Sequence, residues 1–373
     1  MKKIGILGGG QLGRMMLQAA ANYPCTTYVL EKSTDAPAAH LCDVFVTGDI
    51  RVYDDVLAFG RSVDVLTIEI EHVNIEALKV LEAEGKRVIP SVAVLETIAD
   101  KGLQKEFYQA HGIATSAFVL TENRQDVAQY EKRLPAVHKL CKGGYDGKGV
   151  QMVNSASDFE KAFDAPAVLE DKVEVEKEVA VLVARDATGN TVAYPPVEMI
   201  FDPVYNLVDY LVSPANLSEA EQESAVALAH QVVEAFQSPG LFAIELLMDK
   251  GGKFWVNETA PRVHNSGHHS IEGNYCSQFD MLIRLLLEWP MGNTDMTEPA
   301  LMANIIGPEG LSGNVKLEGL QEVLSLQGVY LHWYGKHDTK PGRKLGHLTI
   351  LGETTRSIAL LKSIRKVLRI SGI

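Results

Sequence analysis

Two glutamates stand in apolar surroundings that the sequence predicts to be paired strands. Residues 242–248 and 253–257 alternate in polarity on either side of an Asp-Lys-Gly-Gly turn, which predicts an antiparallel hairpin carrying Glu245 and Glu258. Buried carboxylates are costly unless a partner offsets their charge, and two on neighbouring strands repel each other. A Mg²⁺ ion relieves both problems and is typically held by one or two carboxylates together with substrate phosphates. We therefore predict a magnesium site at Glu245 and Glu258, with Asn257 as a third ligand or an orienting group; two surface glutamates are the alternative.

A glycine-rich stretch from Lys142 to Gly149 is a candidate phosphate loop. It reads Lys-Gly-Gly-Tyr-Asp-Gly-Lys-Gly, and such a loop presents backbone N–H and ammonium groups to phosphate oxygens. It is not a Walker A loop, because no Gly-Lys-Ser/Thr follows at the required spacing. A plain hairpin turn is the alternative. Lys139, in the predicted strand before the loop, and Lys101 are further candidate phosphate contacts.

The chain begins with a second glycine motif. Gly8, Gly10 and Gly13 follow a predicted strand, open a predicted helix and match the spacing G-x-G-x-x-G. With Glu31 at the end of the next predicted strand, this pattern is typical of a dinucleotide site. The same turn also offers helix N–H groups to other anions, or it serves only a tight connection. The motif alone leaves these three interpretations open.

Three histidines, His264, His268 and His269, raise the question of zinc. The intervening Asn-Ser-Gly interrupts any helix that would align His264 with His268, and adjacent residues of an extended chain point apart. The sequence therefore does not predict a zinc site.

Hydrophobic periodicity predicts the elements that position these residues. Strands alternating with helices over the first 90 residues indicate a parallel sheet, with strands at 3–7, 26–30, 63–68 and 87–89 and helices at 12–21 and 75–84. We expect one helix over 92–111, and further strands at 136–139, 168–170, 179–184 and 192–200. Two more helices are expected at 218–236, opened by a Ser218–Glu221 capping box, and at 278–289. Short strands from residue 301 lead to a terminal helix whose apolar stripe should pack in the core: Ile358, Leu361, Ile364 and Leu368.

Composition limits the classes of function. The chain has 373 residues, 46% of them hydrophobic and 22% charged, which is typical of a globular protein with two or three domains. The net charge of −13 argues against nucleic-acid binding, because neutralising phosphates needs a broad basic surface. Four cysteines without a C-x-x-C pair favour a reducing, cytoplasmic setting. No apolar run of about 18 residues predicts a membrane span, and the strand-like start is not expected to be a signal peptide.

Taken together, these residues resemble a known superfamily. Asp100-Lys101, Lys139, residues 143–149, Glu170 to Glu178, Glu245 and Asn257-Glu258 follow one another as in ATP-grasp enzymes. Segments 257–267, 334–336 and 342–347 are similar to the 5-(carboxyamino)imidazole ribonucleotide synthases of de novo purine synthesis. The resemblance covers nearly the whole chain and implies an α/β and α+β protein. Its expected parts are a Rossmann-like N-terminal domain (1–99), an ATP-grasp domain (100–297) with a mobile glycine-loop lobe at about 113–171, and a small mainly-β C-terminal domain (298–373).

The resemblance implies an ATP site. Glu170 would begin the hinge strand beside adenine, the backbone at Lys172 and Val173 would read the base edge, and Glu178 would hold the ribose hydroxyls. Glu245 and Glu258 would hold Mg²⁺. The remaining residues implied at the ATP phosphates are Lys101, Lys139, Gly144, Lys148 and Asn257.

The resemblance also implies a reaction and a substrate site. Bicarbonate would attack the γ-phosphate of ATP to give carboxyphosphate and then CO₂, and the exocyclic amine of 5-aminoimidazole ribonucleotide would attack that carbon. Asp146, beside Tyr145, is expected to act as the base or to orient the amine, and Arg262 and His264 to lie near the reacting carboxyl group. The residues expected to bind the ribonucleotide or bicarbonate are Gly10, Gln11 and Leu12, chiefly through backbone N–H groups, and Glu71, Asn265, Ser266, Lys336, Arg343 and Lys344.

Three competing interpretations stay open. A sister ATP-grasp ligase, such as a formate-dependent ribonucleotide transformylase or a carboxylase, is disfavoured by the segment 343–347. An NAD-dependent dehydrogenase is supported only by residues 8–13 and Glu31. A non-catalytic nucleotide-binding module would not need Glu245, Glu258 and Asp146 together. The family further implies small-molecule substrates and a homodimer, with no nucleic-acid or membrane partner.

Overall fold

The N-terminal part is a parallel sheet with helices on both faces. The computed structural model describes residues 1–144 and 149–372. The strand order is β3-β2-β1-β4-β5 and every neighbouring pair is parallel, which is the predicted Rossmann-like arrangement. The strands are β1 (Lys2–Leu7), β2 (Cys25–Glu31), β3 (Val44–Thr47), β4 (Val65–Ile68) and β5 (Arg87–Val88), and the helices are α1 (Gln11–Ala20), α2 (Tyr53–Arg61) and α3 (Ile75–Ala83).

The single helix predicted over 92–111 is two helices, α4 (Val92–Ile98) and α5 (Lys101–Ala110). Asp100 separates them in an extended conformation, and its side chain accepts the N–H groups of Gly102 and Leu103. Aspartate is a strong N-cap because it satisfies donors that have no partner within the helix. The prediction was wrong here because this cap interrupts an otherwise continuous helical pattern. As a result, Lys101 begins α5 at the edge of the site described below.

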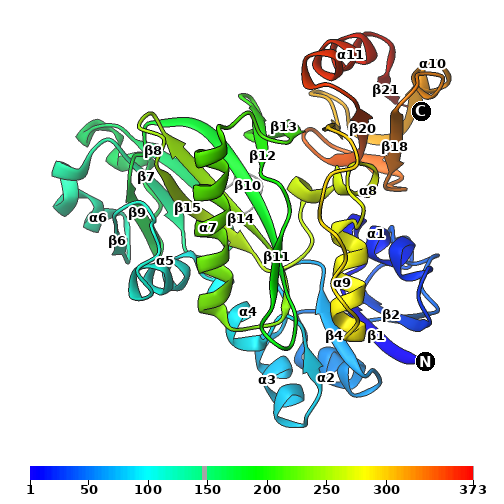
Figure 1. Cartoon of the computed structure of the whole chain (residues 1–373). Helices are drawn as coiled ribbons and strands as arrows, with labels where there is room; N and C mark the ends of the chain where they lie inside the picture. The colour runs from blue at the N-terminus through cyan, green and yellow to red at the C-terminus, as the bar shows by residue number, and fades with distance from the viewer. Residues whose placement is uncertain (145–148, 373) are drawn as a thin grey trace.

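A small antiparallel sheet precedes and follows the glycine loop. Its strand order is β6-β9-β7-β8, and β7 and β8 lead directly into and out of the loop. The strands are β6 (Phe118–Thr121), β7 (Ala136–Leu140), β8 (Val150–Val153) and β9 (Ala167–Asp171), joined by the short helices α6 (Arg124–Val127), η1 (Ala128–Arg133) and η2 (Ala156–Lys161). Figure 1 shows this sheet as a lobe beside the large sheet.

The large sheet carries the predicted hairpin. Its strands run in the order β15-β14-β10-β12-β13-β16-β20-β18, and α7 (Glu219–Phe236) lies against β10, β14 and β15. The Ser218–Glu221 capping box that opens α7 is confirmed. The strand predicted over 192–200 is two strands, because Pro195 and Pro196 cannot donate to a ladder. The strands are β10 (Val175–Arg185), β11 (Thr191–Ala193), which pairs with β10, β12 (Val197–Asp202), β13 (Leu207–Ser213), β14 (Gly240–Asp249) and β15 (Phe254–Ala260).

The C-terminal strands continue the large sheet. β16 (Ala300–Ile306) pairs with β13, which would otherwise be an open edge, and β20 (Lys344–Leu351) and β18 (Val329–Trp333) follow. Leu361 and Ile364 of the predicted stripe are buried, and Ile358 and Leu368 pack against the same cluster, so the core assignment of the stripe is confirmed. The remaining elements are β17 (Gly313–Glu318), β19 (Asp338–Thr339), β21 (Arg369–Gly372), α10 (Leu320–Leu324) and α11 (Thr354–Val367).

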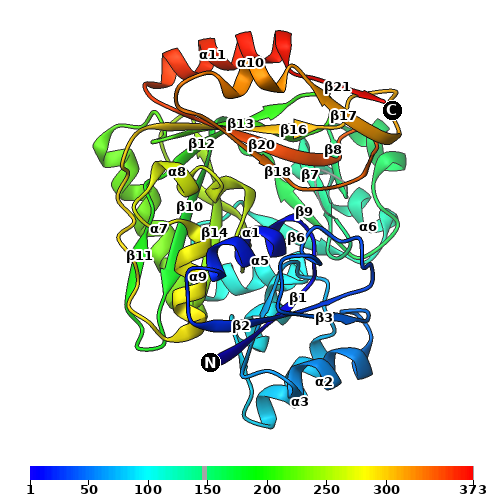
Figure 2. The same cartoon turned by 90° about the vertical axis from the view of Figure 1, so that its right-hand side faces the viewer.

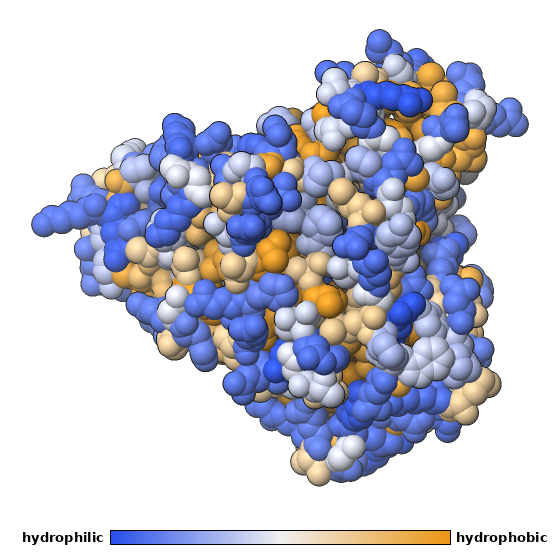
Figure 3. All heavy atoms as spheres, in the orientation of Figure 1, coloured by the Kyte–Doolittle hydropathy of each residue, from blue (hydrophilic) through white to orange (hydrophobic). Residues whose placement is uncertain are grey.

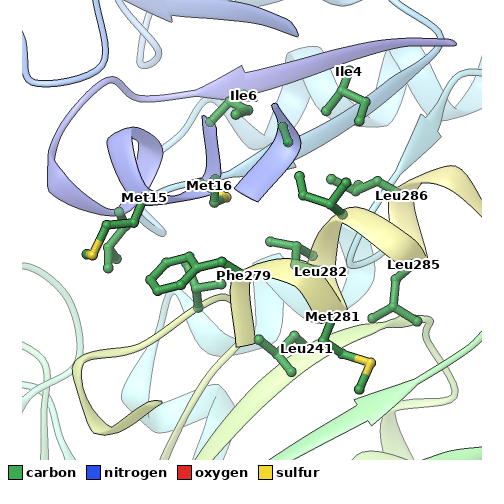
Figure 4. Close-up of a cluster of buried hydrophobic side chains, with 14 of the residues drawn as sticks. Ile4, Ile6, Met15, Met16, Leu241, Phe279, Met281, Leu282, Leu285 and Leu286 are labelled. Atoms are coloured by element: carbon green, nitrogen blue, oxygen red, sulfur yellow. The ribbon is translucent and has the colours of Figure 1, made fainter. Parts of the chain in front are cut away.

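One helix joins the parts. The apolar α9 (Gln278–Leu287) lies between α1 and β14, so Met16 packs near Phe279 and Leu282 on one side while Leu241 and Met281 meet on the other (Figure 4). These side chains are almost fully buried, and burial of each large apolar side chain stabilises the contact by roughly 1.5–3 kcal/mol. The N-terminal part is thereby packed against the large sheet through α9.

The two ends of the molecule are formed by the N-terminal helices α2 and α3 and by the C-terminal helices α10 and α11, with the large sheet between them (Figure 2). Hydrophilic residues cover most of the face in Figure 3. No helix among the described residues is both long and apolar enough to cross a membrane.

Candidate active site

A cavity of about 880 Å³ gathers residues from distant parts of the chain. The predicted site residues that line it are Gln11, Leu12, Glu71, Lys101, Gly144, Glu245, Glu258, Arg262, His264, Asn265 and Lys344. The predicted residues that do not line it are Gly10, Lys139, Glu170, Lys172, Val173, Glu178, Asn257, Ser266, Lys336 and Arg343. The catalytic candidates Tyr145 and Asp146, and Lys148, lie outside the described residues.

The two hairpin glutamates lie directly opposite each other. Glu245 of β14 is the cross-strand partner of Glu258 of β15, and Lys101 forms an ion pair with Glu258. Burial and the neighbouring negative charge of Glu258 raise the pKa of Glu245, whereas the Lys101 ammonium lowers the pKa of Glu258. Lys101 thus offsets the negative charge of Glu258 but does not form an ion pair with Glu245. This donor set fits Mg²⁺, since two carboxylates leave most coordination positions to phosphate oxygens and water.

Lys139 is held in a buried network beside this pair. Its ammonium lies 3.1 Å from Glu170 Oε1 and donates to Asn257 Oδ1 at 2.8 Å. Glu170 Oε2 accepts from Ser116 Oγ at 2.6 Å and lies 2.9 Å from Lys105 Nζ. Burial opposes ionisation of Glu170, but Lys139 and Lys105 lower its pKa to about 2.

Two predicted ATP-site residues belong to this network. The Glu170 carboxylate contacts Lys105 and Lys139 inside the protein, because its burial requires charge partners. The Asn257 oxygen accepts from Lys139 and so orients that lysine; its role as a third metal ligand stays a prediction. Lys172 and Val173 lie in the connection from β9 to β10, just after Glu170, where the hinge strand beside adenine was predicted to begin. Glu178 is half-buried on β10, and burial raises its pKa.

The segment after β15 carries the predicted catalytic pair. Arg262 Nη2 lies 2.9 Å from Glu71 Oε1, which ties this segment to the N-terminal part. His264 Nε2 lies 3.7 Å from Glu245 Oε1. Among the described residues, the Arg262 Nε atom is buried without a hydrogen-bond partner. The other guanidinium nitrogens are engaged, because Nη1 donates to the backbone oxygen of Val263 and Nη2 pairs with Glu71, and the residue lines the cavity.

Asn265 and Ser266 support this segment from within. The side-chain amides of Asn265 and Asn304 exchange two hydrogen bonds of 3.0 Å each, and Ser266 Oγ lies 3.0 Å from His264 Nδ1. Both residues are buried, Asn265 lines the cavity, and Ser266 orients the His264 ring. Their predicted binding of substrate stays a prediction.

The opening glycine turn is already filled by a carboxylate. Glu69, which follows β4, is 4% exposed and accepts the N–H groups of Gly10 at 2.5 Å and of Leu12 at 3.0 Å. Glu31 accepts the N–H of Gly9 at 3.0 Å. The donors that a dinucleotide phosphate would use are therefore occupied. The backbone N–H groups of Gly10 and Leu12, predicted to contact substrate, donate to Glu69 in this structure, while Gln11 and Leu12 line the cavity. Their contact with substrate stays a prediction.

The three basic residues predicted to bind the ribonucleotide phosphate, Lys336, Arg343 and Lys344, do not line the same cavity. Lys344 lines the main cavity, whereas Lys336 lines a neighbouring hollow of about 290 Å³ and donates to the backbone oxygen of Lys344 at 2.7 Å. Arg343 Nη1 lies 2.7 Å from Asp338 Oδ1.

Four polar residues of these buried networks were not predicted from the sequence. Lys105, Ser116, Asn304 and Glu69 are polar residues within ordinary helical, loop or strand patterns, and only their burial and partners mark them. Tyr334 and His268 also line the cavity. Charged residues such as Lys105 and Glu69 are almost never fully buried unless they are paired. Their burial therefore marks them as members of a network, and burial cannot be read from the sequence.

Comparisons with known proteins agree with this architecture. A sequence model of the ATP-grasp domain matches residues 106–279, and models of the ribonucleotide synthetase preATP-grasp domain and of the phosphoribosylaminoimidazole carboxylase C-terminal domain match residues 1–99 and 300–359. The fold and the site define an ATP-grasp enzyme.

Curated N5-carboxyaminoimidazole ribonucleotide synthases from Synechococcus elongatus and Bacillus subtilis are 34% and 33% identical to this chain, over 94% and 93% of it and 89% and 91% of their own lengths. A solved structure of that enzyme from Thermotoga maritima has a TM-score of 0.92 and 37% identity over both full chains, and one from Aspergillus clavatus, in complex with ADP and 5-aminoimidazole ribonucleotide, has a TM-score of 0.87 and 30% identity over 98% of this chain and 99% of its own. The chain belongs to the N5-carboxyaminoimidazole ribonucleotide synthase family of ATP-grasp ligases.

Proposed function

We propose that this enzyme carboxylates the exocyclic amine of 5-aminoimidazole ribonucleotide with bicarbonate, using Mg²⁺ and ATP and releasing ADP and phosphate. The observation that carries the proposal is the facing pair Glu245 and Glu258, with Lys101 beside it, in the cavity that also contains Arg262 and His264. These residues support a phosphoryl-transfer site and a carboxylate-binding site in the same cavity. The relative from Aspergillus clavatus, whose structure contains ADP and the ribonucleotide, supports both substrates.

The first half-reaction needs positive charge around the γ-phosphate. Glu245 and Glu258 would hold Mg²⁺, which neutralises charge on the transferred phosphoryl group. Lys101 and Lys139 supply further ammonium groups, and both are already oriented by protein oxygens. Such preorganisation avoids reorganising dipoles during the reaction, and we propose that bicarbonate becomes carboxyphosphate here.

The second half-reaction needs a bound carboxyl carbon next to the amine. We propose that Arg262, steadied by Glu71, binds the carboxyl oxygens through the N–H groups that remain, and that His264 lies at the same group. Asp146 is proposed as the base or orienting group, with Tyr145 beside it. Lys344 and the adjacent Lys336 and Arg343 are proposed to attract the ribonucleotide phosphate in an otherwise acidic protein.

The remaining site assignments are proposals of the same kind. The backbone at Lys172 and Val173 would contact adenine, Glu178 the ribose, and Gly144 and Lys148 the phosphates. Gln11 would contact the ribonucleotide or bicarbonate. We also propose the domain limits 1–99, 100–297 and 298–373, with a mobile lobe at about 113–171, and a cytoplasmic homodimer, as the family resemblance implies.

One assay tests the proposal. Protein is mixed with Mg-ATP, bicarbonate and 5-aminoimidazole ribonucleotide, and ADP release is followed with each component omitted in turn. ADP release should depend on the ribonucleotide and on bicarbonate. Equal rates with and without the ribonucleotide would exclude this function. Replacement of bicarbonate by formate tests the sister ligase, which would then be the active enzyme.

A further inference from the structure

We propose that Lys105 is a positioning residue of the ATP site, which acts through Glu170 on the phosphate-binding Lys139. The inference rests on the proposed role of Lys139 in ATP binding. Lys105 is on α5 and is 2% exposed, so it is a charged residue enclosed by the protein. Ammonium groups are rarely buried without a structural or chemical reason, because desolvation is costly.

The contacts of Lys105 are complete. Its Nζ donates to Thr115 Oγ1 at 2.6 Å and to Ser116 Oγ at 2.9 Å, and it lies 2.9 Å from Glu170 Oε2. An ammonium group has three donors, and all three are therefore engaged inside the protein. Lys105 itself has no donor left for a phosphate oxygen, which makes it a positioning group rather than a ligand-binding one.

Lys105 determines how the Glu170 carboxylate is oriented. Oε2 is held by Lys105 and by Ser116 Oγ, so Oε1 is the oxygen directed at Lys139, 3.1 Å away. Without Lys105, Oε2 keeps only the Ser116 Oγ contact, the carboxylate loses one of its two neighbouring ammonium groups, and its charge acts more strongly on Lys139. The carboxylate would compete with phosphate for the Lys139 ammonium, and the net charge beside the phosphates would fall by one.

The same network connects the two sheets at the phosphate position. Thr115 Oγ1 donates to the backbone oxygen of Val256 on β15, and Lys139 on β7 donates to Asn257 on β15. Glu170 belongs to β9 of the small sheet, and Lys105 belongs to α5, which contacts β9. The position of Lys139 relative to the hairpin glutamates is therefore set through groups that Lys105 holds.

The test uses Lys105→Met, which keeps the length of the side chain and removes the charge. We expect the KM for ATP and the Kd for Mg-ADP, measured by calorimetry, to rise about tenfold, as for loss of one charge-assisted hydrogen bond. The KM for 5-aminoimidazole ribonucleotide should stay within about twofold, because none of the contacts of Lys105 involves a residue proposed to bind that substrate. Lys362→Met, an exposed lysine on α11, is the matched control for loss of charge and should change neither.

A double-mutant cycle tests whether Lys105 acts through Glu170. In a Glu170→Gln background, Lys105→Met should add little to the Kd for Mg-ADP. Effects that multiply in the double variant would overturn the proposal, as would equal increases in the KM of both substrates. If Lys105→Met does not fold, Ser116→Ala removes the other donor to Glu170 Oε2 and should raise the same Kd by a smaller factor; an unchanged Kd would also overturn it. Because Mg-ADP binding is measured without turnover, failure of the proposed reaction is distinguished from failure of this inference.

Discussion

Replacement of Glu69 by glutamine tests whether the opening glycine turn is closed by a protein carboxylate. In the wild type, one carboxylate accepts the N–H groups of Gly10 and Leu12 at the start of α1. Glutamine has the same shape but only one accepting oxygen, so its amide NH₂ must face one of these two N–H groups. Burial raises the pKa of Glu69, but the backbone donors at Gly10, Gly13 and Leu12 favour its ionised form.

The magnitude follows from what the variant loses. One buried N–H without a partner costs about 1–3 kcal/mol. Loss of the negative charge at the N-terminus of α1 costs roughly 0.5–2 kcal/mol more at a partly buried site. We therefore expect Glu69→Gln to destabilise the N-terminal part by about 1.5–5 kcal/mol.

Hydrogen exchange measured by mass spectrometry on peptides covering residues 8–14 is the direct assay, because local opening is read where the change is made. Exchange there should accelerate by at least tenfold, while peptides from α7 keep their rates. Glu31→Gln is the matched control, since Glu31 accepts the N–H of Gly9 at a partly exposed position and should have a small effect. Unchanged exchange in Glu69→Gln would refute the reasoning and would return these N–H groups to the substrate, as the sequence had predicted.

Two further predictions concern the carboxylates of the ATP site. Glu258→Gln should abolish ADP release while the unfolding midpoint changes by only a few degrees, because the change removes a proposed metal ligand and the partner of Lys101; near-normal turnover would remove Glu258 from the metal site. Glu170, whose pKa is lowered to about 2 from an ordinary value near 4.5, contributes stability above about pH 4.5 that is lost as the pH falls through that value towards 2. The contribution is on the order of 3 kcal/mol for a shift of this size, so denaturant unfolding between pH 5 and pH 3 should be less pH-dependent in Glu170→Gln than in the wild type. The same change at the exposed Glu176 should leave the pH dependence unaltered, and equal slopes in all three proteins would contradict the buried ion-pair network.

Elements with strong local signals were predictable. The β14–β15 hairpin, the capping box of α7 and the apolar stripe of α11 depend on residues close together in the chain, and each was predicted and is present. The errors also have local causes that were visible but underweighted. Asp100 caps α5 and divides a helix, and Pro195-Pro196 divides a strand.

The candidate site was only partly predictable. The placement of Glu245 and Glu258 on neighbouring strands followed from the predicted hairpin, but their direct facing did not. The predicted strand ends would pair Glu245 with Val256, whereas a bulge between Glu245 and Leu246 brings Glu258 opposite Glu245. The partners of Glu170, Asn265 and Gly10 did not follow, since each comes from a distant segment. Sequence resemblance could assign these residues to a site but not say whether their polar groups were free.

The sequence by itself determined the order of the parts, the acidic hairpin, the glycine loop and the family. Those features depend on residue types and short spacings, so they can be recognised without knowing how the chain packs. Only the tertiary structure decided which charges meet. Glu69 closes the glycine turn from 57 to 59 residues away, and Lys105 holds Glu170 and, through it, Lys139. The physical reason is that the energy of a buried charge depends on its nearest partners, and long-range folding, not local pattern, selects those partners.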